Sequence, residues 1–181
     1  MKWCCTASVQ YTDNNPLILG FPPIIVMSFS LVSPAFKYGE RIPKKYTCDD
    51  VDVSPPLQWS GTPTGTKSLV LIMEDPDAPM GVFTHWVLYN IPPDRSELPE
   101  NVPKTPTVEG IGVQGVNDFG RVGYGGPCPP RGHKPHRYFF RLYALNTVPN
   151  IKQRASKDEV LRIIRSNIIG TAEYMGVYSR G

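Results

Sequence analysis

The chain has 181 residues, of which 40% are hydrophobic and 10% aromatic, enough for one globular domain with its own core. Its 20 prolines and 16 glycines exclude a helical bundle and favour short strands joined by ordered loops. The formal net charge of +3 is mild and no basic run occurs, so a nucleic-acid surface is excluded while small anionic ligands stay compatible.

Residues 1–26 differ in pattern from the rest of the chain. They contain no continuous apolar core and no small-residue cleavage site, and Pro22 and Pro23 interrupt their apolar run. We interpret them as a disordered tail or as the product of a start codon upstream of Met27, with an atypical export or anchoring segment as the alternative. The predicted domain is then 27–181. No stretch approaches 18 uninterrupted apolar residues, so no transmembrane segment is predicted.

Four segments in the first half of the domain are predicted to be strands. The first lies within Ser28–Phe36, and Leu57–Trp59 forms a short second one. Lys67–Glu74 is a continuous run of mostly branched apolar residues, which predicts a central strand buried on both faces. His85–Ile91 is the next strand. Strict alternation would place these side chains on one face: His85, Val87, Tyr89 and Ile91.

The stretch 124–138 is the most distinctive of the chain. Its four prolines fix φ, and Gly125 and Gly126 permit close backbone approach, so a stiff loop is predicted. The aromatic segment that follows, Arg137–Leu145, predicts a strand. A period of two places His136, Tyr138, Phe140, Leu142 and Ala144 on one face and Arg137 and Arg141 on the other. A small pocket is expected where the buried face meets the loop.

One helix is predicted late in the chain. Ser156–Glu159 is a capping box, and Gly170 is expected to end the helix. The apolar stripe would comprise Val160, Leu161, Ile163, Ile164 and Ile168. Taken together, these elements predict a mainly all-β chain. We expect an antiparallel, Greek-key-like two-sheet β-sandwich with a C-terminal helix and short helical segments.

The four cysteines, at positions 4, 5, 48 and 128, form no spaced framework and no CxxC or zinc pattern. We therefore predict a reducing, cytoplasmic compartment, with Cys48 and Cys128 as small buried thiols. A Cys48–Cys128 disulfide is the alternative.

Titratable side chains gather at three predicted strand ends: Asp75 and Asp77, then His85, then His133 and His136 with Tyr138. A carboxylate that faces an imidazole fixes its tautomer and raises its pKa, so we expect the aspartates to orient the histidines. Each cluster alone is compatible with a structural role, because Asp-Pro-Asp forms turns and a lone strand histidine is often a core residue. Their coincidence favours a site.

Five motifs follow one another in the chain: Ser54-Pro-Pro-Leu-Gln-Trp59, Lys67–Pro79 with its Asp-Pro-Asp-Ala-Pro, His85-Trp86, Asn117-Asp-Phe-Gly120, and Gly125-Gly-Pro-Cys-Pro-Pro-Arg-Gly132 with His136-Arg-Tyr138. The DPDAP and GPCPPRG…HRY pair is highly specific in this order and at this separation. From about Phe29 to Tyr178 the chain resembles the phosphatidylethanolamine-binding protein family, most closely its bacterial and archaeal branch of Raf kinase inhibitor-like proteins. Residues 1–26 lie outside the resemblance.

The resemblance implies a β-sandwich with a shallow cavity that binds phosphate-like anions or phospholipid head groups. Because the sequence offers no activated nucleophile and no metal spacing, we expect no turnover, metal or cofactor. Imidazoles and a tyrosine hydroxyl can donate to an anion, and loop amides such as that of Gly126 can point inward. The resemblance also allows a homodimer and regulation of a protease or kinase through the rim, although the family's C-terminal segment has no clear match here. By motif position the expected site comprises Asp75, Asp77, His85, Pro130, His136 and Tyr138.

Two enzyme hypotheses compete with this one. A metal-dependent hydrolase would use His85, His133 and His136 with an aspartate, but no HExxH or similar spacing occurs. A Cys128 nucleophile would lack the helix N-terminus that usually lowers a thiol pKa. We therefore rank a non-enzymatic binding module first, a protein regulator second and a hydrolase third.

Overall fold

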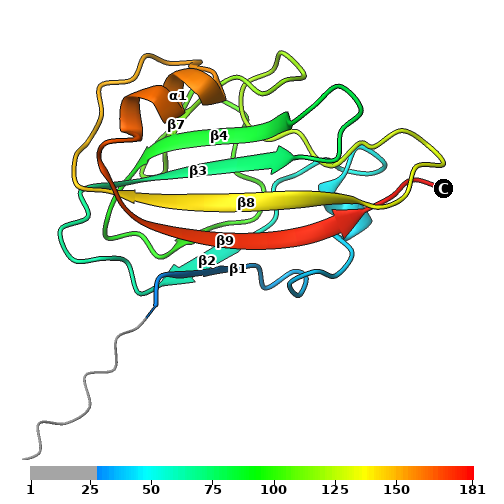
Figure 1. Cartoon of the computed structure of the whole chain (residues 1–181), viewed down its shortest axis with the longest axis horizontal. Helices are drawn as coiled ribbons and strands as arrows, with labels where there is room; N and C mark the ends of the chain where they lie inside the picture. Colours follow the sequence, from blue (N-terminus) through cyan, green and yellow to red (C-terminus); the bar gives the residue numbers. More distant parts are fainter. Residues whose placement is uncertain (1–27) are drawn as a thin grey trace, which may run out of the picture.

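The computed structural model describes residues 28–181, and two antiparallel sheets dominate it (Figure 1). The predicted tail or extended start, 1–26, lies outside the described residues. The three-stranded sheet has the order β1 (Ser30–Val32), β2 (Leu57–Ser60), β5 (Glu97–Leu98). The six-stranded sheet has the order β6 (Thr107–Val108), β7 (Gly112–Gln114), β4 (Phe83–Ile91), β3 (Ser68–Asp75), β8 (His136–Leu145), β9 (Ile168–Tyr178). The predicted mainly-β, two-sheet fold is confirmed.

The larger sheet is buried on both faces at its centre, as predicted for β3. Leu69, Leu71 and Met73 join the core between the two sheets. Val70 and Ile72 face a second cluster, to which the helix α1 (Lys157–Ile164) contributes. Because β3 pairs with β4 on one side and β8 on the other, its backbone N–H and C=O groups find hydrogen-bond partners in both neighbouring strands. The predicted face of β8, from Tyr138 to Ala144, lies in the core between the sheets.

The helix is shorter than predicted, and a strand follows it. The capping box is present, since Ser156 Oγ accepts the Glu159 N–H and the Glu159 carboxylate accepts the Ser156 N–H. The helix ends at Ile164, and Ile168 and Gly170 belong to β9. The predicted end of the helix at Gly170 is therefore wrong, because residues from Ile168 onward pair with β8 at ten positions and complete the edge of the sheet.

β4 departs from strict alternation at both ends. Its register with β3 shifts between Met73 and Glu74 and again between Leu69 and Leu71. Val87 and Tyr89 face the second cluster as alternation requires. The bulges turn two other side chains to the opposite face: Ile91 joins the core between the sheets, and His85 lies against Tyr138. The prediction that His85, Val87, Tyr89 and Ile91 share a face is therefore wrong.

The two domain cysteines form a disulfide, which corrects the prediction of free, buried thiols. Cys48 and Cys128 are 80 positions apart, and the fold brings their Cα atoms to 5.4 Å. The Cys48 N–H also donates to the Pro127 carbonyl at 3.2 Å. Cys48 is exposed and Cys128 is half-buried. The alternative stated from the sequence, a Cys48–Cys128 disulfide, is the arrangement found, and long-range folding creates the approach.

Over residues 28–181 no helix is both long enough and apolar enough to cross a bilayer.

Candidate functional site

Four strands of the larger sheet begin or end on the same side of the molecule, on the right in Figure 1. β3 ends there at Asp75, which pairs with Phe83 at the start of β4. β8 begins there at His136, which pairs with Tyr178 at the end of β9. The fold therefore brings the predicted histidine and aspartate clusters together at these strand ends, although they are distant in sequence.

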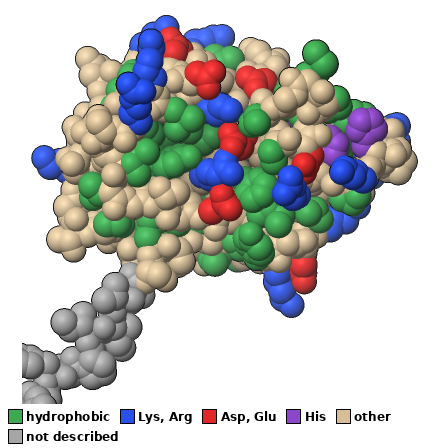
Figure 2. All heavy atoms as spheres, viewed as in Figure 1, with side chains coloured by type: hydrophobic (Ala, Val, Ile, Leu, Met, Phe, Trp, Pro, Cys, Tyr) green, Lys and Arg blue, Asp and Glu red, His purple; other side chains and the backbone are tan. Residues whose placement is uncertain are grey.

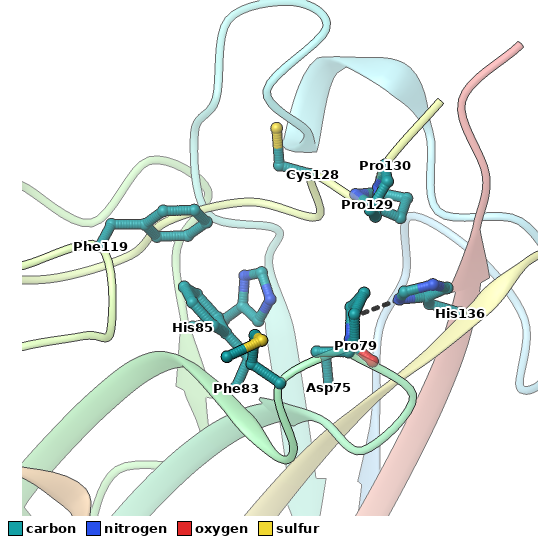
Figure 3. A pocket seen from close by; sticks show the side chains of 11 residues that line it. Asp75, Pro79, Phe83, His85, Phe119, Cys128, Pro129, Pro130 and His136 are labelled. Atoms are coloured by element: carbon teal, nitrogen blue, oxygen red, sulfur yellow. Dashed lines mark hydrogen bonds and ion pairs between the residues drawn. The ribbon is translucent and has the colours of Figure 1, made fainter. Parts of the chain in front are cut away.

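A cavity of about 220 Å³ opens at these strand ends (Figure 3). Four of the predicted site residues line it: Asp75, His85, Pro130 and His136. The rest of the wall is mainly apolar and comprises Ala78, Pro79, Met80, Phe83, Phe119 and Pro129, together with Cys128. Its volume lies below the range of about 300–1,000 Å³ typical of sites for drug-sized ligands, so it suits a small ligand or one end of a larger one.

His136 and Asp75 form a buried pair in the wall of the cavity. His136 Nδ1 lies 2.8 Å from Asp75 Oδ2, and the two side chains are 3% and 4% exposed. The carboxylate accepts, so Nδ1 carries the proton and Nε2 is the nitrogen left for a ligand. This pair satisfies the expectation that an aspartate orients a histidine.

His85 is oriented by the backbone instead of by a carboxylate. Its Nδ1–H donates to the Gly125 carbonyl at 2.7 Å, and the Gly125 N–H donates back to the His85 carbonyl at 2.9 Å. Burial lowers the pKa of His85 below its ordinary value, and this outweighs the opposite effects of the Gly125 carbonyl and Asp75. His85 is therefore neutral at neutral pH, with Nε2 as an acceptor, and the raised pKa expected beside an aspartate does not apply to it.

Tyr138 lies behind His85 and does not line the cavity. Their rings are edge to face with centroids 5.2 Å apart, and Tyr138 is fully buried. Its hydroxyl has no hydrogen-bond partner within the described part of the chain. Burial raises the pKa of Tyr138, and the Asp75 carboxylate adds to the effect. The hydroxyl is therefore a protonated donor close to the carboxylate.

Two other predicted site residues, Asp77 and Gly126, form hydrogen bonds with other groups of the protein. Asp77 accepts the Arg137 backbone N–H at 2.9 Å and two guanidinium N–H groups at 2.8 Å. These hydrogen bonds lower the pKa of Asp77 to about 2. The Gly126 N–H donates to Asp52 Oδ1 at 2.7 Å, so this amide is not free for a ligand. Neither residue lines the cavity.

Sequence reasoning missed the aromatic side of the cavity. Phe83 and Phe119 pack edge to face at 4.7 Å, and both rings lie within 5.4 Å of the His85 ring. Phe119 belongs to the Asn117–Gly120 motif, so that motif could have indicated it as a site residue. Cys128 contributes to the wall, but its sulfur points away from both histidines, toward Cys48 (Figure 3). As a disulfide it cannot serve as the nucleophile considered above.

The third histidine, His133, is exposed on the loop before β8. Its ring lies 5.7 Å from that of His136, yet it does not line the cavity. Within residues 28–181, no group of three or more His, Cys, Asp or Glu side chains is placed to hold a metal ion.

Comparison with known sequences finds a matching family model and several related proteins. The family model of phosphatidylethanolamine-binding proteins matches residues 32–179. A UPF0098 protein of Aquifex aeolicus is 55% identical over 149 residues, which cover 82% of this chain and 86% of that protein. A UPF0098 protein of Methanothermobacter thermautotrophicus is 52% identical and is covered over 99% of its length, with 84% of this chain.

Two solved structures share the fold. A phosphatidylethanolamine-binding protein homologue of Chlamydia trachomatis is 43% identical with a TM-score of 0.77, over 85% of this chain and 99% of that one. YbcL of Escherichia coli, described as a member of the mammalian phosphatidylethanolamine-binding protein family, is 38% identical with a TM-score of 0.79. The match covers 86% of this chain and all of YbcL.

Proposed function

The chain belongs to the phosphatidylethanolamine-binding protein family, in its bacterial and archaeal branch, and from this premise we propose that its cavity binds a phosphate-like anion or a phospholipid head group without turning it over. The observation that carries the proposal is the buried pair of His136 and Asp75 in the wall of a small, mainly apolar cavity. A buried imidazole held by a carboxylate is suited to become an imidazolium when an anion arrives.

The charge of such a complex supports an anion. With His136 protonated, the pair with Asp75 is neutral, and Nε2–H can donate a charge-assisted hydrogen bond to a phosphate oxygen. The apolar wall keeps water away from that bond and strengthens it. Without a proton on His136, the charge of Asp75 would repel an anionic ligand.

The second histidine of the cavity, His85, adds a preference among anionic ligands. Neutral His85 offers an acceptor at Nε2, because its Nδ1–H is engaged by Gly125. A bare dianion has nothing to donate to it, whereas a hydrogen phosphate hydroxyl or the ammonium group of ethanolamine has. Ligands that combine an anionic oxygen with a donor therefore fit the two histidines best.

Turnover is not part of the proposal. Cys128 is oxidised, and the cavity wall contains no serine, threonine or lysine to act as a nucleophile. Regulation of a protease or kinase through the rim and a homodimer remain compatible with the fold, but no contact among the described residues favours either one. The predicted cytoplasmic location rested on reduced cysteines, and the Cys48–Cys128 disulfide removes that ground.

Calorimetry with phosphorylethanolamine tests the proposal. The parent protein should bind saturably, and His136→Gln should weaken binding about tenfold by removing the charge-assisted hydrogen bond. His133→Gln is the matched control, because His133 is exposed and outside the cavity. No saturable binding by the parent, or equal losses in the two variants, would contradict the proposal.

A further inference from the structure

The Cys48–Cys128 disulfide joins a wall of the cavity to a surface loop. Cys128 lines the cavity and is half-buried, whereas Cys48 is exposed on the segment between β1 and β2. The Cys128 sulfur is directed away from the cavity (Figure 3). Because access decides which sulfur of a disulfide is attacked, a reductant from solution reaches this bond from the Cys48 side.

The two sulfurs differ in their charged neighbours. The Arg180 guanidinium donates from Nη1 to Cys128 Sγ at 3.6 Å, and Asp49 holds Arg180 by accepting its Nε–H at 2.9 Å. Over residues 28–181 no side chain donates a hydrogen bond to the Cys48 sulfur. A cation beside a thiolate lowers its pKa, and a thiol of lower pKa leaves faster in thiol–disulfide exchange. Attack at the exposed sulfur therefore expels the better leaving group, the Cys128 thiolate.

The charge around the disulfide favours an anionic attacking group. Arg131 and Lys134 are exposed on the loop that follows Cys128. In the part of the chain that the structure describes, neither has a carboxylate side chain at ion-pair distance. Figure 2 shows Lys and Arg side chains beside the histidine at this end of the molecule. A positive potential of this kind attracts a thiolate, which is the reactive form of a thiol.

The part of the cavity wall that the disulfide anchors has few other attachments. Three of the residues 127–130 are prolines, which have no N–H to donate. The Pro127 carbonyl accepts the Cys48 N–H at 3.2 Å, and within residues 28–181 this is the one backbone hydrogen bond between 127–130 and the Cys48 loop. Cys128, Pro129 and Pro130 all line the cavity. Opening the disulfide therefore releases this part of the wall.

We propose that the Cys48–Cys128 disulfide is an exchange site for a dithiol reductant, which attacks Cys48 Sγ, and that its reduction loosens the cavity wall. A thiolate of the reductant forms a bond to Cys48 Sγ, the protein S–S bond breaks, and its electron pair leaves on Cys128 as a thiolate beside Arg180. The second thiol of the reductant then loses its proton and attacks the reductant's own sulfur in the mixed disulfide. Cys48 leaves as a thiolate and takes up a proton. The reductant ends as a disulfide, and its two electrons have passed to the two cysteines.

The partner is a dithiol because of the position of the leaving thiolate. Cys128 stays next to the mixed disulfide, with its Cα atom 5.4 Å from that of Cys48, and it would expel a monothiol by the reverse attack. A second thiol on the reductant competes with that return. The effect of reduction on ligand binding rests on the proposed function of the cavity, whereas the exchange chemistry does not.

Mapping the first mixed disulfide tests the direction of attack. The folded parent is treated with excess glutathione and quenched with acid, and the modified cysteine is located by peptide mass spectrometry. Glutathione should be found on Cys48, with Cys128 as the free thiol. Glutathione found first on Cys128 would overturn the proposed exchange site.

Replacing Arg180 tests the leaving group. Arg180→Gln should slow reduction by dithiothreitol about threefold, because the departing thiolate loses its cation, and Arg180→Lys should restore most of the rate. Arg41→Gln is the matched control, since Arg41 is a nearby cation that contacts Ser179 and no sulfur. Acid-quenched thiol counts measure the rates. A merely structural role of Arg180 would loosen the loop and speed the reduction, so an unchanged or faster rate in Arg180→Gln would overturn the role of Arg180.

Calorimetry with phosphorylethanolamine tests the effect on the cavity. Reduction of the parent with dithiothreitol should weaken binding about fivefold, as expected if the released wall keeps its binding arrangement about a fifth of the time. Cys48→Ser/Cys128→Ser should bind like the reduced parent and should not respond to dithiothreitol, and circular dichroism checks that both stay folded. Equal affinities of the oxidised and reduced parent would overturn the link to the cavity. An oxidised parent that does not bind would overturn the proposed function and this link together, while attack at Cys48 would still support the exchange site.

Discussion

Asp75, at the end of β3, and His136, at the start of β8, lie 61 positions apart in sequence and meet in one hydrogen bond of 2.8 Å. Both side chains are almost completely buried, and one wall of the cavity is built on them. Because Asp75 occupies Nδ1, the pair determines which nitrogen of His136 a ligand can reach.

Asp75→Asn keeps an oxygen that can accept the Nδ1–H of His136 and removes the counter-charge. An imidazolium without a counter-charge is costly in a buried site, so we expect the affinity for phosphorylethanolamine to fall about tenfold. Calorimetry near pH 6 measures this, with the exposed Asp50→Asn as the control. An unchanged affinity in Asp75→Asn would mean that His136 binds the ligand as a neutral ring.

Asp77→Asn should leave the ligand affinity within about twofold of the parent, because Asp77 is bound to Arg137 outside the cavity. Its effect should be on acid stability. A carboxyl whose pKa is about 2 in the folded protein, below its unfolded value, stabilises the fold above about pH 4 and loses that contribution as the pH falls through about 2. Urea unfolding of parent and variant should therefore converge at low pH. A tenfold loss of ligand affinity instead would place Asp77 in the site.

His85 makes the stability of the fold fall on mild acidification. Burial lowers its folded pKa, so the unfolded chain takes up a proton first as the pH drops below about 6.5. The free energy of unfolding should then decrease with falling pH, by up to about 1.4 kcal/mol per pH unit for one proton. His85→Asn should show a shallower slope in urea unfolding between about pH 7 and pH 5. His133→Gln, which changes an exposed histidine, should keep the pH dependence of the parent. If His85→Asn also kept it, the pH dependence could not be assigned to His85.

The Cys48–Cys128 disulfide closes a long loop, with a sequence separation of 80. Loop-closure entropy of this size stabilises a fold by about 4 kcal/mol, and measured effects span about 2–5 kcal/mol. The double variant Cys48→Ser/Cys128→Ser should lower the free energy of unfolding in urea by an amount in that range. Dithiothreitol should lower the parent to the same level and leave the double variant unaffected. A parent that is insensitive to reductant would show that the two sulfurs are not linked.

Local patterns in the sequence were sufficient for much of the site. The alternation from Tyr138 to Ala144 predicted the buried face of β8, and the run before Asp75 predicted the central strand. Asp75, His85, Pro130 and His136 were predicted site residues, and all four line the cavity. These predictions depend on spacings of a few residues and on motif identity, which the sequence records directly.

Only the tertiary structure decided what each of these groups contacts. The sequence allowed either aspartate to face either histidine, and the fold pairs Asp75 with His136, Asp77 with Arg137 and His85 with a backbone carbonyl. A bulge opposite Met73 and Glu74 turns His85 off the face that alternation assigns to it. The physical reason is that strand register and the closing of long loops depend on contacts between distant segments, whose energies no local spacing encodes.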